Sequence, residues 1–373
     1  MLRIALIGCG KIADQHIDAI ARIPDSSVVA VCDRELLMAR QLAERYKIEG
    51  CFADAGEMLR TAKPDAVHIT TPPQGHFALA TQCLEAGCHV YLEKPFTVTA
   101  SEARSLIQTA ERQGRRIVAG HNYQFTPETM QMRELVKGGF LGGRATHLDC
   151  HFSYDLGDAT YVGPLLASKR HWVRQLPGQL LHNILSHPVA KLAEFLDDDL
   201  VEVIARADQS PALRKMGGSD VFDELRVMIK DSQGTTAFLC FTTQAKPSLN
   251  QLRICGPKNS LFVDQTSCNL IRHETKSFKS YLIFFGPPWQ MARQYFRNTR
   301  RNIFQFIGRK LFLDFGMKEL IQRFYDSIRD PNLPPPIPYR EILLTAEIMD
   351  QTFAQIYPKN QPASSTPTES PRP

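Results

Sequence analysis

A glycine-rich turn near the start of the chain constrains its fold more than any other feature. The apolar segment LRIALI at residues 2–7 predicts a buried strand, and Gly8-Cys9-Gly10-Lys11-Ile12-Ala13 follows it with Gly-x-Gly-x-x-Ala spacing. The first glycine of such a turn permits a tight bend, the second lets a pyrophosphate approach the backbone, and a small third residue allows close helix packing. Because the next helix begins here, its N-terminal N–H groups face the phosphates. The spacing therefore predicts a dinucleotide-binding site.

An acid at the end of the second predicted strand supports the same interpretation. Asp33 ends the segment VVAVCD, twenty residues after Ala13, where a carboxylate binds the hydroxyls of the adenosine ribose. Since a carboxylate repels a 2′-phosphate, we expect NAD as the cofactor. Arg34 lies next to Asp33 and can pair with such a phosphate, so NADP is the alternative.

The chain divides into two parts with different patterns. Residues 1–122 alternate short apolar segments with stretches of helical length, which is typical of a parallel sheet covered by helices on both faces. Residues 123–356 contain strand candidates joined by hairpin-like turns, such as ELRVMIKDSQGTTAFLCFTT. We therefore expect an α/β protein with an N-terminal Rossmann domain and a C-terminal α+β domain built on a large, open, mainly antiparallel sheet. A last helix at 340–356 can pack back on the first domain, and the tail at 357–373 is expected to be disordered.

Length and composition agree with a soluble protein of two domains. The chain has 373 residues, more than one core usually fills, and no apolar run approaches the ~20 residues that span a bilayer. Its nine cysteines are scattered without a Cys-x-x-Cys pair. This pattern favours free thiols in a reducing cytoplasm over disulfides, and we expect no metal site.

A second functional segment joins two predicted strand ends. The strand candidate DAVHIT runs into Thr71-Pro72-Pro73, a helix begins near His76, and the strand HVYL leads into Glu93-Lys94-Pro95. Ligands of doubly wound sheets bind beyond the carboxyl ends of the strands, so Lys94 is expected in the site. The alternative is a solvated lysine at a strand end, although such a side chain does not require the proline that follows and restricts the backbone.

The glycine turn, the Glu-Lys-Pro unit and the segment GPKNSLFVD at 256–264 together resemble the Gfo/Idh/MocA family, the glucose-fructose oxidoreductase and inositol dehydrogenase group. The resemblance is close over residues 1 to about 125 and looser beyond. It implies a two-domain enzyme in which Lys94 lies near the nicotinamide and contacts the substrate hydroxyl. Since the open sheet of the family often forms a dimer interface, a homodimer or homotetramer is expected. Cofactor contacts are predicted for Gly8, Gly10, Lys11, Ile12, Asp33, Arg34, Thr70, Thr71, Pro72, His76, Glu93, Lys94 and Asn122.

The second half of the site departs from the family pattern. The family usually carries a helix resembling Gly-Gly-x-x-x-x-Asp-x-Gly-x-His, whereas PGQLLHNILSHPVAKLAEF at 177–195 has no aspartate. Asn183 and His187 are four residues apart on one helix face, so they correspond to that Asp and His. His182 diverges from His187 by about 140°, which favours a packing or supporting role, or a substrate contact if the helix shifts by one residue. We expect His187 to act as base, Lys94 as donor or alternative base, and Asn183 to orient a hydroxyl.

Aromatic and cationic residues are candidates for substrate binding. The loop YVGPLLASKRHWVRQ at 161–175 contains Tyr161, Arg170 and Trp172, and Tyr123 follows the last predicted strand of the first domain. A sugar stacked on Trp172, with a phosphate or carboxylate near Arg170, fits these residue types. The alternative is a solvated basic loop in which Trp172 anchors the core. Gln124 stands where many relatives have an arginine, which removes a charge.

Basic charge is concentrated in one segment. Residues 275–313 contain eight Lys or Arg and no acid, which leaves 36 basic and 39 acidic residues elsewhere in a chain of net charge +5. A helix within 289–312 places Arg293, Arg297 and Arg300 on one face and apolar residues broadly opposite. Such a helix can lie on an anionic membrane surface, for example the inner face of the membrane, or on a partner. The interpretation that we favour is a helix with its apolar face in the core and its arginines in water. No nucleic-acid-binding motif accompanies the charge, so no nucleic-acid partner is expected.

Taken together, these features favour an NAD-dependent oxidoreductase. It would transfer hydride between nicotinamide and a hydroxyl-bearing carbon of a sugar or nucleotide sugar, for example in surface polysaccharide biosynthesis. The first alternative is a lyase or glycosidase that oxidises the sugar transiently and recycles its cofactor. The second is a non-catalytic NAD-binding protein, because Asn183 cannot take the proton that an aspartate would accept.

Overall fold

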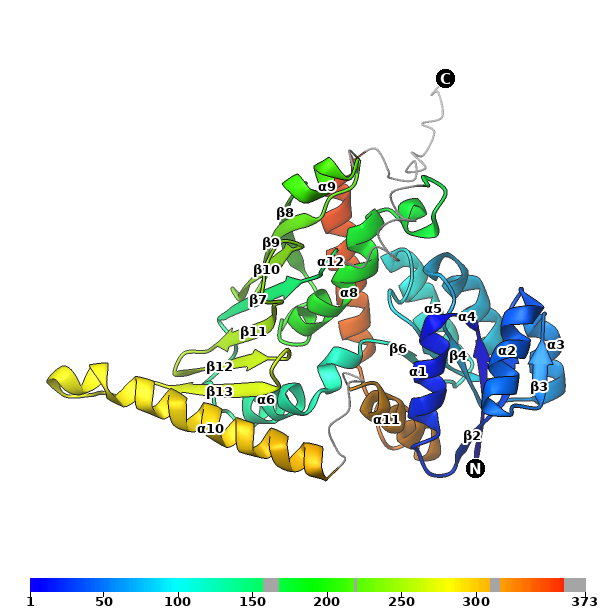
Figure 1. The fold of residues 1–373 in the computed structure, drawn as a ribbon, viewed down its shortest axis with the longest axis horizontal. Helices are drawn as coiled ribbons and strands as arrows, with labels where there is room; N and C mark the ends of the chain where they lie inside the picture. The colour runs from blue at the N-terminus through cyan, green and yellow to red at the C-terminus, as the bar shows by residue number, and fades with distance from the viewer. Residues whose placement is uncertain (157–167, 218–219, 309–315, 359–373) are drawn as a thin grey trace, which may run out of the picture.

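Two sheets, connected by helices that run between them, make up the fold (Figure 1). The computed structural model describes residues 1–156, 168–217, 220–308 and 316–358. The first domain contains a six-stranded sheet in the order β3-β2-β1-β4-β5-β6, with every neighbouring pair parallel. Its strands are β1 Leu2–Ile7, β2 Ser26–Cys32, β3 Gly50–Phe52, β4 Ala66–Ile69, β5 His89–Leu92 and β6 Ile117–Ala119. The predicted Rossmann domain is confirmed.

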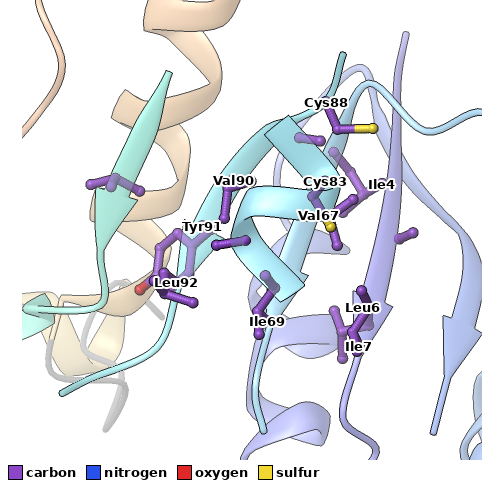
Figure 2. Close-up of a cluster of buried hydrophobic side chains, with 14 of the residues drawn as sticks. Ile4, Leu6, Ile7, Val67, Ile69, Cys83, Cys88, Val90, Tyr91 and Leu92 are labelled. Carbon is purple, nitrogen blue, oxygen red and sulfur yellow. The ribbon is translucent and has the colours of Figure 1, made fainter. Parts of the chain in front are cut away.

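Helices on both faces explain why the central strands of this sheet are mostly apolar. The connecting helices are α1 Lys11–Ile20, α2 Leu36–Tyr46, α3 Ala55–Ala62, α4 His76–Glu85 and α5 Ala100–Arg112. Figure 2 shows side chains of β1, β4 and β5 packed into one cluster with Cys83 and Cys88. Burial raises the pKa of Cys88 to about 11, so its thiol stays protonated. The order of strands changes direction between β1 and β4, which is the switch point where such sheets bind ligands.

The second domain contains a seven-stranded sheet in the order β13-β12-β11-β7-β10-β9-β8. Its strands are β7 His147–Ser153, β8 Val201–Asp208, β9 Glu224–Asp231, β10 Thr236–Thr242, β11 Asn250–Cys255, β12 Asn259–Asp264 and β13 Asn269–Glu274. Strands β7 and β10 are parallel, and the other five neighbouring pairs are antiparallel. Helices α8 Gln179–Ala193 and α12 Tyr339–Ile356 cover one face, whereas Ile204 and Phe238 are exposed on β8 and β10. The predicted open, mainly antiparallel sheet is confirmed.

The chain returns to the first domain after the second sheet. Helix α11 Met317–Arg329 packs beside α1, and its Leu320, Ile321 and Phe324 are fully buried in the core of the first domain. The predicted boundary at residue 122 assigned this helix to the second domain, and the structure instead divides the segment after 316 between both. Helix α11 is strongly amphipathic, so its apolar side needs an apolar surface to pack on. The side of α1 that faces it provides this surface.

Helix α12 joins the two domains along its length. On the side of the first domain, Ala100 N–H donates to Asp350 Oδ2 at 2.8 Å, and Arg104 pairs with Glu347 at 2.5 Å. On the other side, Phe353 belongs to the apolar core of the second domain. The predicted helix at 340–356 therefore contacts α5 of the first domain as well as the second sheet.

The remaining helices are α6 Pro127–Lys137, α9 Pro211–Lys215 and α10 Gly286–Ile307. Among the described residues, four 3₁₀ turns accompany them: η1 Pro73–Gly75, η2 Asn122–Phe125, η3 Trp172–Gln175 and η4 Ser280–Phe284. None of the helices within the described ranges is long and apolar enough to cross a membrane. The predicted disordered tail lies outside the described residues from residue 359 onward.

Candidate functional site

The glycine turn between β1 and α1 leaves the space that a pyrophosphate requires. Gly8 has a φ of +101°, and a Cβ there would lie 2.8 Å from both the Thr70 carbonyl carbon and the Thr71 nitrogen. Glycine is therefore required, because the dihedral angle and the close backbone each exclude a side chain. A Cβ at Gly10 would meet no described atom within 4 Å, and no described side chain caps the start of α1. This open space in front of a helix N-terminus fits a phosphate group.

Asp33 lies beside the turn at the end of β2. Its Oδ2 accepts a hydrogen bond from the Cys9 N–H at 2.8 Å, and its Oδ1 accepts one from the Glu35 N–H at 2.9 Å. These bonds fix the carboxylate, and each oxygen keeps acceptor capacity for a ribose hydroxyl. Lys11 and Arg34 are exposed near it. The residues present thus fit a dinucleotide, and the ribose contacts of Asp33 and Arg34 stay predictions.

Two of the residues predicted to contact the cofactor also connect strand ends. Thr70 Oγ1 donates to Gly8 O at 2.6 Å, which ties the end of β4 to the glycine turn. His76 is fully buried, with Nε2 2.9 Å from Thr71 O and Nδ1 3.0 Å from Pro95 O. The ring of His76 thus supports the loops after β4 and β5, and its contact with the cofactor stays a prediction.

A buried chain of hydrogen bonds leads from α11 to Glu93. Tyr325 Oη lies 2.8 Å from His68 Nε2. His68 Nδ1 lies 2.9 Å from His16 Nδ1, and His16 Nε2 lies 3.0 Å from Glu93 Oε1. Each of these hydrogen bonds has one donor and one acceptor if Tyr325 donates to His68, His68 donates to His16, and His16 donates to an ionised Glu93. Burial alone would raise the pKa of Glu93, but the bond from His16 and the charge of Lys94 outweigh it and lower that pKa.

This chain of bonds changes the role assigned to Glu93. The Glu93 side chain points into the protein, and a Cβ on Gly120 would lie only 2.9 Å from its Oε1. The carboxylate therefore supports the site from inside the protein, and the contact of Glu93 with the cofactor stays a prediction. Sequence reasoning missed His16 and His68, although His68 is a histidine within the otherwise apolar strand β4. Such a residue requires a buried hydrogen-bond partner.

Lys94 reaches from the end of β5 toward α8 of the second domain. Its Nζ donates to the backbone oxygen of Asn183 at 3.1 Å, and its own N–H donates to Glu93 Oε2 at 3.1 Å. Removal from water lowers the pKa of Lys94, and the nearby Glu93 charge partly opposes this shift. The lysine therefore lies between the two domains, with an ammonium group that releases a proton more readily than one in water.

His187 follows one turn later on α8. The centre of its ring lies 4.4 Å from that of Tyr123 and 6.4 Å from that of His121. Burial and the positive charge of Lys94 hold the pKa of His187 well below 6.5. Its Nδ1 is buried and has no hydrogen-bond partner among the described residues. His187 is therefore a neutral imidazole near pH 7.

The sequence-based predictions did not include His121, which lies directly after β6. Its ring is 2% exposed, and within the described ranges neither ring nitrogen has a hydrogen-bond partner. Burial lowers the pKa of His121 to about 4. Buried polar groups are rarely left unpaired, so this ring marks a polar space between β6 and His187. The sequence feature that could have indicated His121 was its position just beyond a predicted parallel strand, in the segment GHNYQF.

His182 lies on a different side of α8 from His187. Its ring is 1% exposed and stacks on Phe353 of α12, with ring centres 4.7 Å apart and an angle of 20° between the planes. The predicted contact of His182 with substrate is wrong, because five residues on a helix turn the ring toward α12. The packing role, which the same spacing favoured, is the one observed.

The basic loop meets the first domain at η1. Gln74 Nε2 donates to Trp172 O at 2.7 Å, which fastens η3 beside the predicted cofactor-contact segment at 70–72. The Trp172 side chain is half-buried and Arg170 is exposed. Tyr161 lies outside the described residues. The structure thus brings Trp172 and Arg170 to the boundary between the domains and leaves their contacts with a substrate as predictions.

Gln124, which stands where an arginine is usual, belongs to a buried polar cluster. Its Nε2 donates to Glu194 Oε2 at 3.0 Å and to Glu341 Oε2 at 3.4 Å, and Glu194 pairs with Arg133. Burial and the charge of Glu194 raise the pKa of Glu341 to about 7. The cluster borders a cavity of about 850 Å³ between α6, α11 and the proline-rich segment 331–338. This cavity contains none of the predicted site residues.

We expect Glu341→Gln to flatten the pH dependence of the free energy of unfolding. Folded Glu341 keeps its proton up to about pH 7, whereas an unfolded glutamate releases it near pH 4.5. Between these values the folded state binds more protons, so stability falls as pH rises, by up to about 3 kcal/mol. The glutamine removes this loss. Urea unfolding at about pH 5 and about pH 8 measures the effect, with Glu111→Gln on the exposed side of α5 as control, and an unchanged pH slope in Glu341→Gln would contradict it.

Comparison with known proteins agrees with this arrangement. A family model described as "Oxidoreductase family, NAD-binding Rossmann fold" matches residues 2–121, and one described as "GFO/IDH/MocA C-terminal domain" matches residues 129–262. D-glucoside 3-dehydrogenase of Escherichia coli (strain K12) is 39% identical over 142 residues, which cover 38% of this chain and 40% of that protein. Inositol 2-dehydrogenase of Rubrobacter xylanophilus is 26% identical over 225 residues, 60% of this chain and 59% of that protein.

Solved structures share the whole fold at low sequence identity. The WlbA dehydrogenase from Bordetella pertussis, in complex with NADH and UDP-GlcNAcA, superposes with a TM-score of 0.72 at 18% identity and 96% coverage of both chains. UDP-N-acetylglucosamine 3-dehydrogenase GnnA from Acidithiobacillus ferrooxidans has a TM-score of 0.70 at 18% identity, covering 96% of this chain and 99% of that one. Because the two matched family models together extend over both domains, the chain belongs to the Gfo/Idh/MocA family of oxidoreductases, with an NAD-binding Rossmann domain at its N-terminus.

Proposed function

We propose that the protein transfers hydride between NAD and a hydroxyl-bearing carbon of a sugar or nucleotide sugar. The observation that carries this proposal is the convergence of Lys94, His121 and His187 where the first domain meets α8. These residues come from β5, from the segment after β6 and from α8, so the site forms only where the two domains meet. NADP is the alternative cofactor, since Arg34 is exposed beside Asp33.

The side chains divide the chemistry of oxidation between them. When bound, the nicotinamide ring supplies the hydride acceptor for one direction and the hydride donor for the other. His187 takes the hydroxyl proton, because its lowered pKa keeps the ring neutral. Lys94 donates a hydrogen bond to the oxygen as negative charge develops on it. The carbinol thus loses one hydride and one proton and becomes a carbonyl.

The residues near the domain boundary support a sugar as substrate. Trp172 offers an aromatic ring on which a sugar ring can stack, and Arg170 offers a cation for a diphosphate or a carboxylate. Relatives in both comparisons act on or bind sugars, including free sugar derivatives and UDP-linked sugars. A nucleotide sugar would place the protein in the biosynthesis of surface polysaccharides. We also propose a cytoplasmic location, which its nine free thiols support.

The open face of the second sheet supports a homo-oligomer. Ile204 on β8 is 51% exposed and Phe238 on β10 is 43% exposed, on strands whose other face is covered by α8 and α12. An uncovered sheet face with apolar side chains is a common surface for association. We propose a homodimer or homotetramer that is formed through this face.

A substrate screen tests the proposed reaction. Free sugars, glycosides and nucleotide sugars are incubated with NAD and, separately, with NADP, and the absorbance of the reduced cofactor is followed. We expect one of these classes to reduce NAD, and His187→Asn to lower kcat about a hundredfold. His182→Asn on the same helix is the matched control, because its ring packs on Phe353.

Two results would contradict the proposal. The first is tight binding of NADH without reduction of NAD by any sugar class. The second is consumption of a sugar with no accumulation of NADH, which would favour a lyase or glycosidase that recycles its cofactor. Thermal unfolding of each variant separates loss of chemistry from loss of fold.

A further inference from the structure

Helix α10 lies along the edge strand β13 (Figure 1). It contacts this strand through polar side chains. Gln294 binds both backbone groups of Arg272, accepting from its N–H at 2.9 Å and donating to its oxygen at 3.0 Å. Asn298 is buried and donates to Leu270 O at 2.9 Å. These amide side chains satisfy backbone groups that would otherwise be open to another strand, so α10 closes this edge of the sheet.

The apolar side of α10 consequently points away from the protein. Trp289, Phe296 and Ile303 recur every seven residues, so they lie within about 40° of one another around the helix. Their exposed fractions are 72%, 72% and 52%. We define the α10 apolar face by the exposed apolar side chains of α10 and of the η4 segment before it, which are Tyr281, Leu282, Ile283, Phe284, Phe285, Trp289, Tyr295, Phe296, Ile303, Phe304, Phe306 and Ile307. The favoured prediction, that this helix buries its apolar side in the core, is wrong.

Cationic side chains lie next to the α10 apolar face. A groove of about 330 Å³ between α10 and β13 is lined by Arg272, Lys276, Arg293, Arg297 and Arg301 together with one acid, Glu274. Glu274 pairs with Lys276 at 2.6 Å. Among the described residues, Arg293 and Arg297 have no ion-pair partner, and both are exposed. The groove is therefore ready to accept an anionic group such as a phosphate.

We propose that the α10 apolar face docks on an anionic phospholipid membrane. The helix would lie in the plane of the interface, with its aromatic rings among the upper acyl chains and with Arg293 and Arg297 at the lipid phosphates. Tyrosine and tryptophan suit this position, because each has an apolar ring and a polar atom that stays hydrated.

Charge favours a membrane over a second copy of the chain. Residues 275–313 contain eight basic residues and no acid, so two α10 apolar faces brought together would also bring their arginines together. A lipid surface instead offers many phosphates to one helix. This surface is separate from the Lys94 site, and the proposal does not depend on the proposed reaction.

Co-sedimentation with vesicles tests the proposal on the full chain. We expect binding to vesicles that contain phosphatidylglycerol, and much weaker binding to vesicles of phosphatidylcholine alone. Each basic residue near an anionic surface contributes about fivefold to partitioning, so Arg293→Gln combined with Arg297→Gln should weaken binding about thirtyfold. Trp289→Ser combined with Phe296→Ser should weaken it as well, because the aromatic rings no longer insert.

Matched variants control for charge and for apolar surface. Arg40→Gln with Lys215→Gln removes two exposed basic residues elsewhere, and Leu37→Ser removes an exposed apolar side chain on α2. Both controls should bind as the wild type does. Equal sedimentation with the two vesicle types, or equal sedimentation of the α10 variants and the wild type, would overturn the proposal. So would self-association in sedimentation velocity that the Trp289 and Phe296 changes abolish, because that result assigns the face to a second copy.

Discussion

Lys94→Ala should lower kcat about 10³-fold or more once a substrate is identified, while the affinity for NADH stays close to that of the wild type. The lysine is the one ammonium group that reaches from β5 into the site, and its Nζ already bonds across to α8 at 3.1 Å. Its lowered pKa makes it a stronger donor to a developing alkoxide. Steady-state kinetics and NADH titration measure the two quantities separately.

The interpretation of this variant requires a control for packing. Lys94→Met keeps most of the side-chain volume and removes the charge, so it should lose activity as alanine does without a comparable loss of stability. Lys215→Ala removes an exposed lysine from α9 and should leave the kinetics unchanged. Full activity in the Lys94→Met protein would show that the lysine is a structural group, and the role proposed for it in catalysis would be rejected.

Gly8→Ala should unfold the first domain more readily, with a loss of about 2–4 kcal/mol in the free energy of unfolding. An alanine at a φ of +101° is strained, and its Cβ would overlap the backbone of Thr70 and Thr71 at 2.8 Å. The turn and the end of β4 would both have to move. Urea unfolding without cofactor measures this loss.

Gly10→Ala is the informative comparison, because the two glycines serve different purposes. Gly10 has a φ of −79°, and a Cβ there meets no described atom within 4 Å, so the folded protein should tolerate alanine without loss of stability. The same Cβ would occupy the space predicted for the pyrophosphate, so NADH affinity should fall. If Gly10→Ala bound NADH as the wild type does, the phosphate site would have to lie elsewhere.

Local patterns in the sequence predicted those parts of the site that lie at strand ends or along one helix. The sequence predicted where Gly8, Gly10 and Lys94 lie, because parallel strands bring their carboxyl ends to one edge of the sheet. His187 was readable because four residues along a helix return to the same face, and the same rule indicated that His182 turns away. Both predictions depend only on the regular geometry of a parallel sheet or of a single helix.

Other parts of the site depend on partners that are far away in the sequence. The bond between His68 and Tyr325 joins β4 to α11 across 257 residues, and only the return of α11 to the first domain places the two together. His121 has no distinctive spacing, and its role emerges from burial next to His187. Helix α10 shows the same limit, since its amphipathic pattern was correct while the side it buries was not.

The sequence by itself determined the two fold types, the glycine turn, the strand-end lysine and the face shared by Asn183 and His187, because each of these follows from the repeat of a strand or a helix. The tertiary structure alone decided which side chains meet across domains and which helix face meets the protein. The backbone of β13 needs hydrogen-bond partners, and the amides of α10 supply them, so the polar face packs inward and the aromatic face is left outside. The apolar periodicity of α10 cannot predict this arrangement, because the unpaired backbone groups belong to β13, a different element at the edge of the sheet.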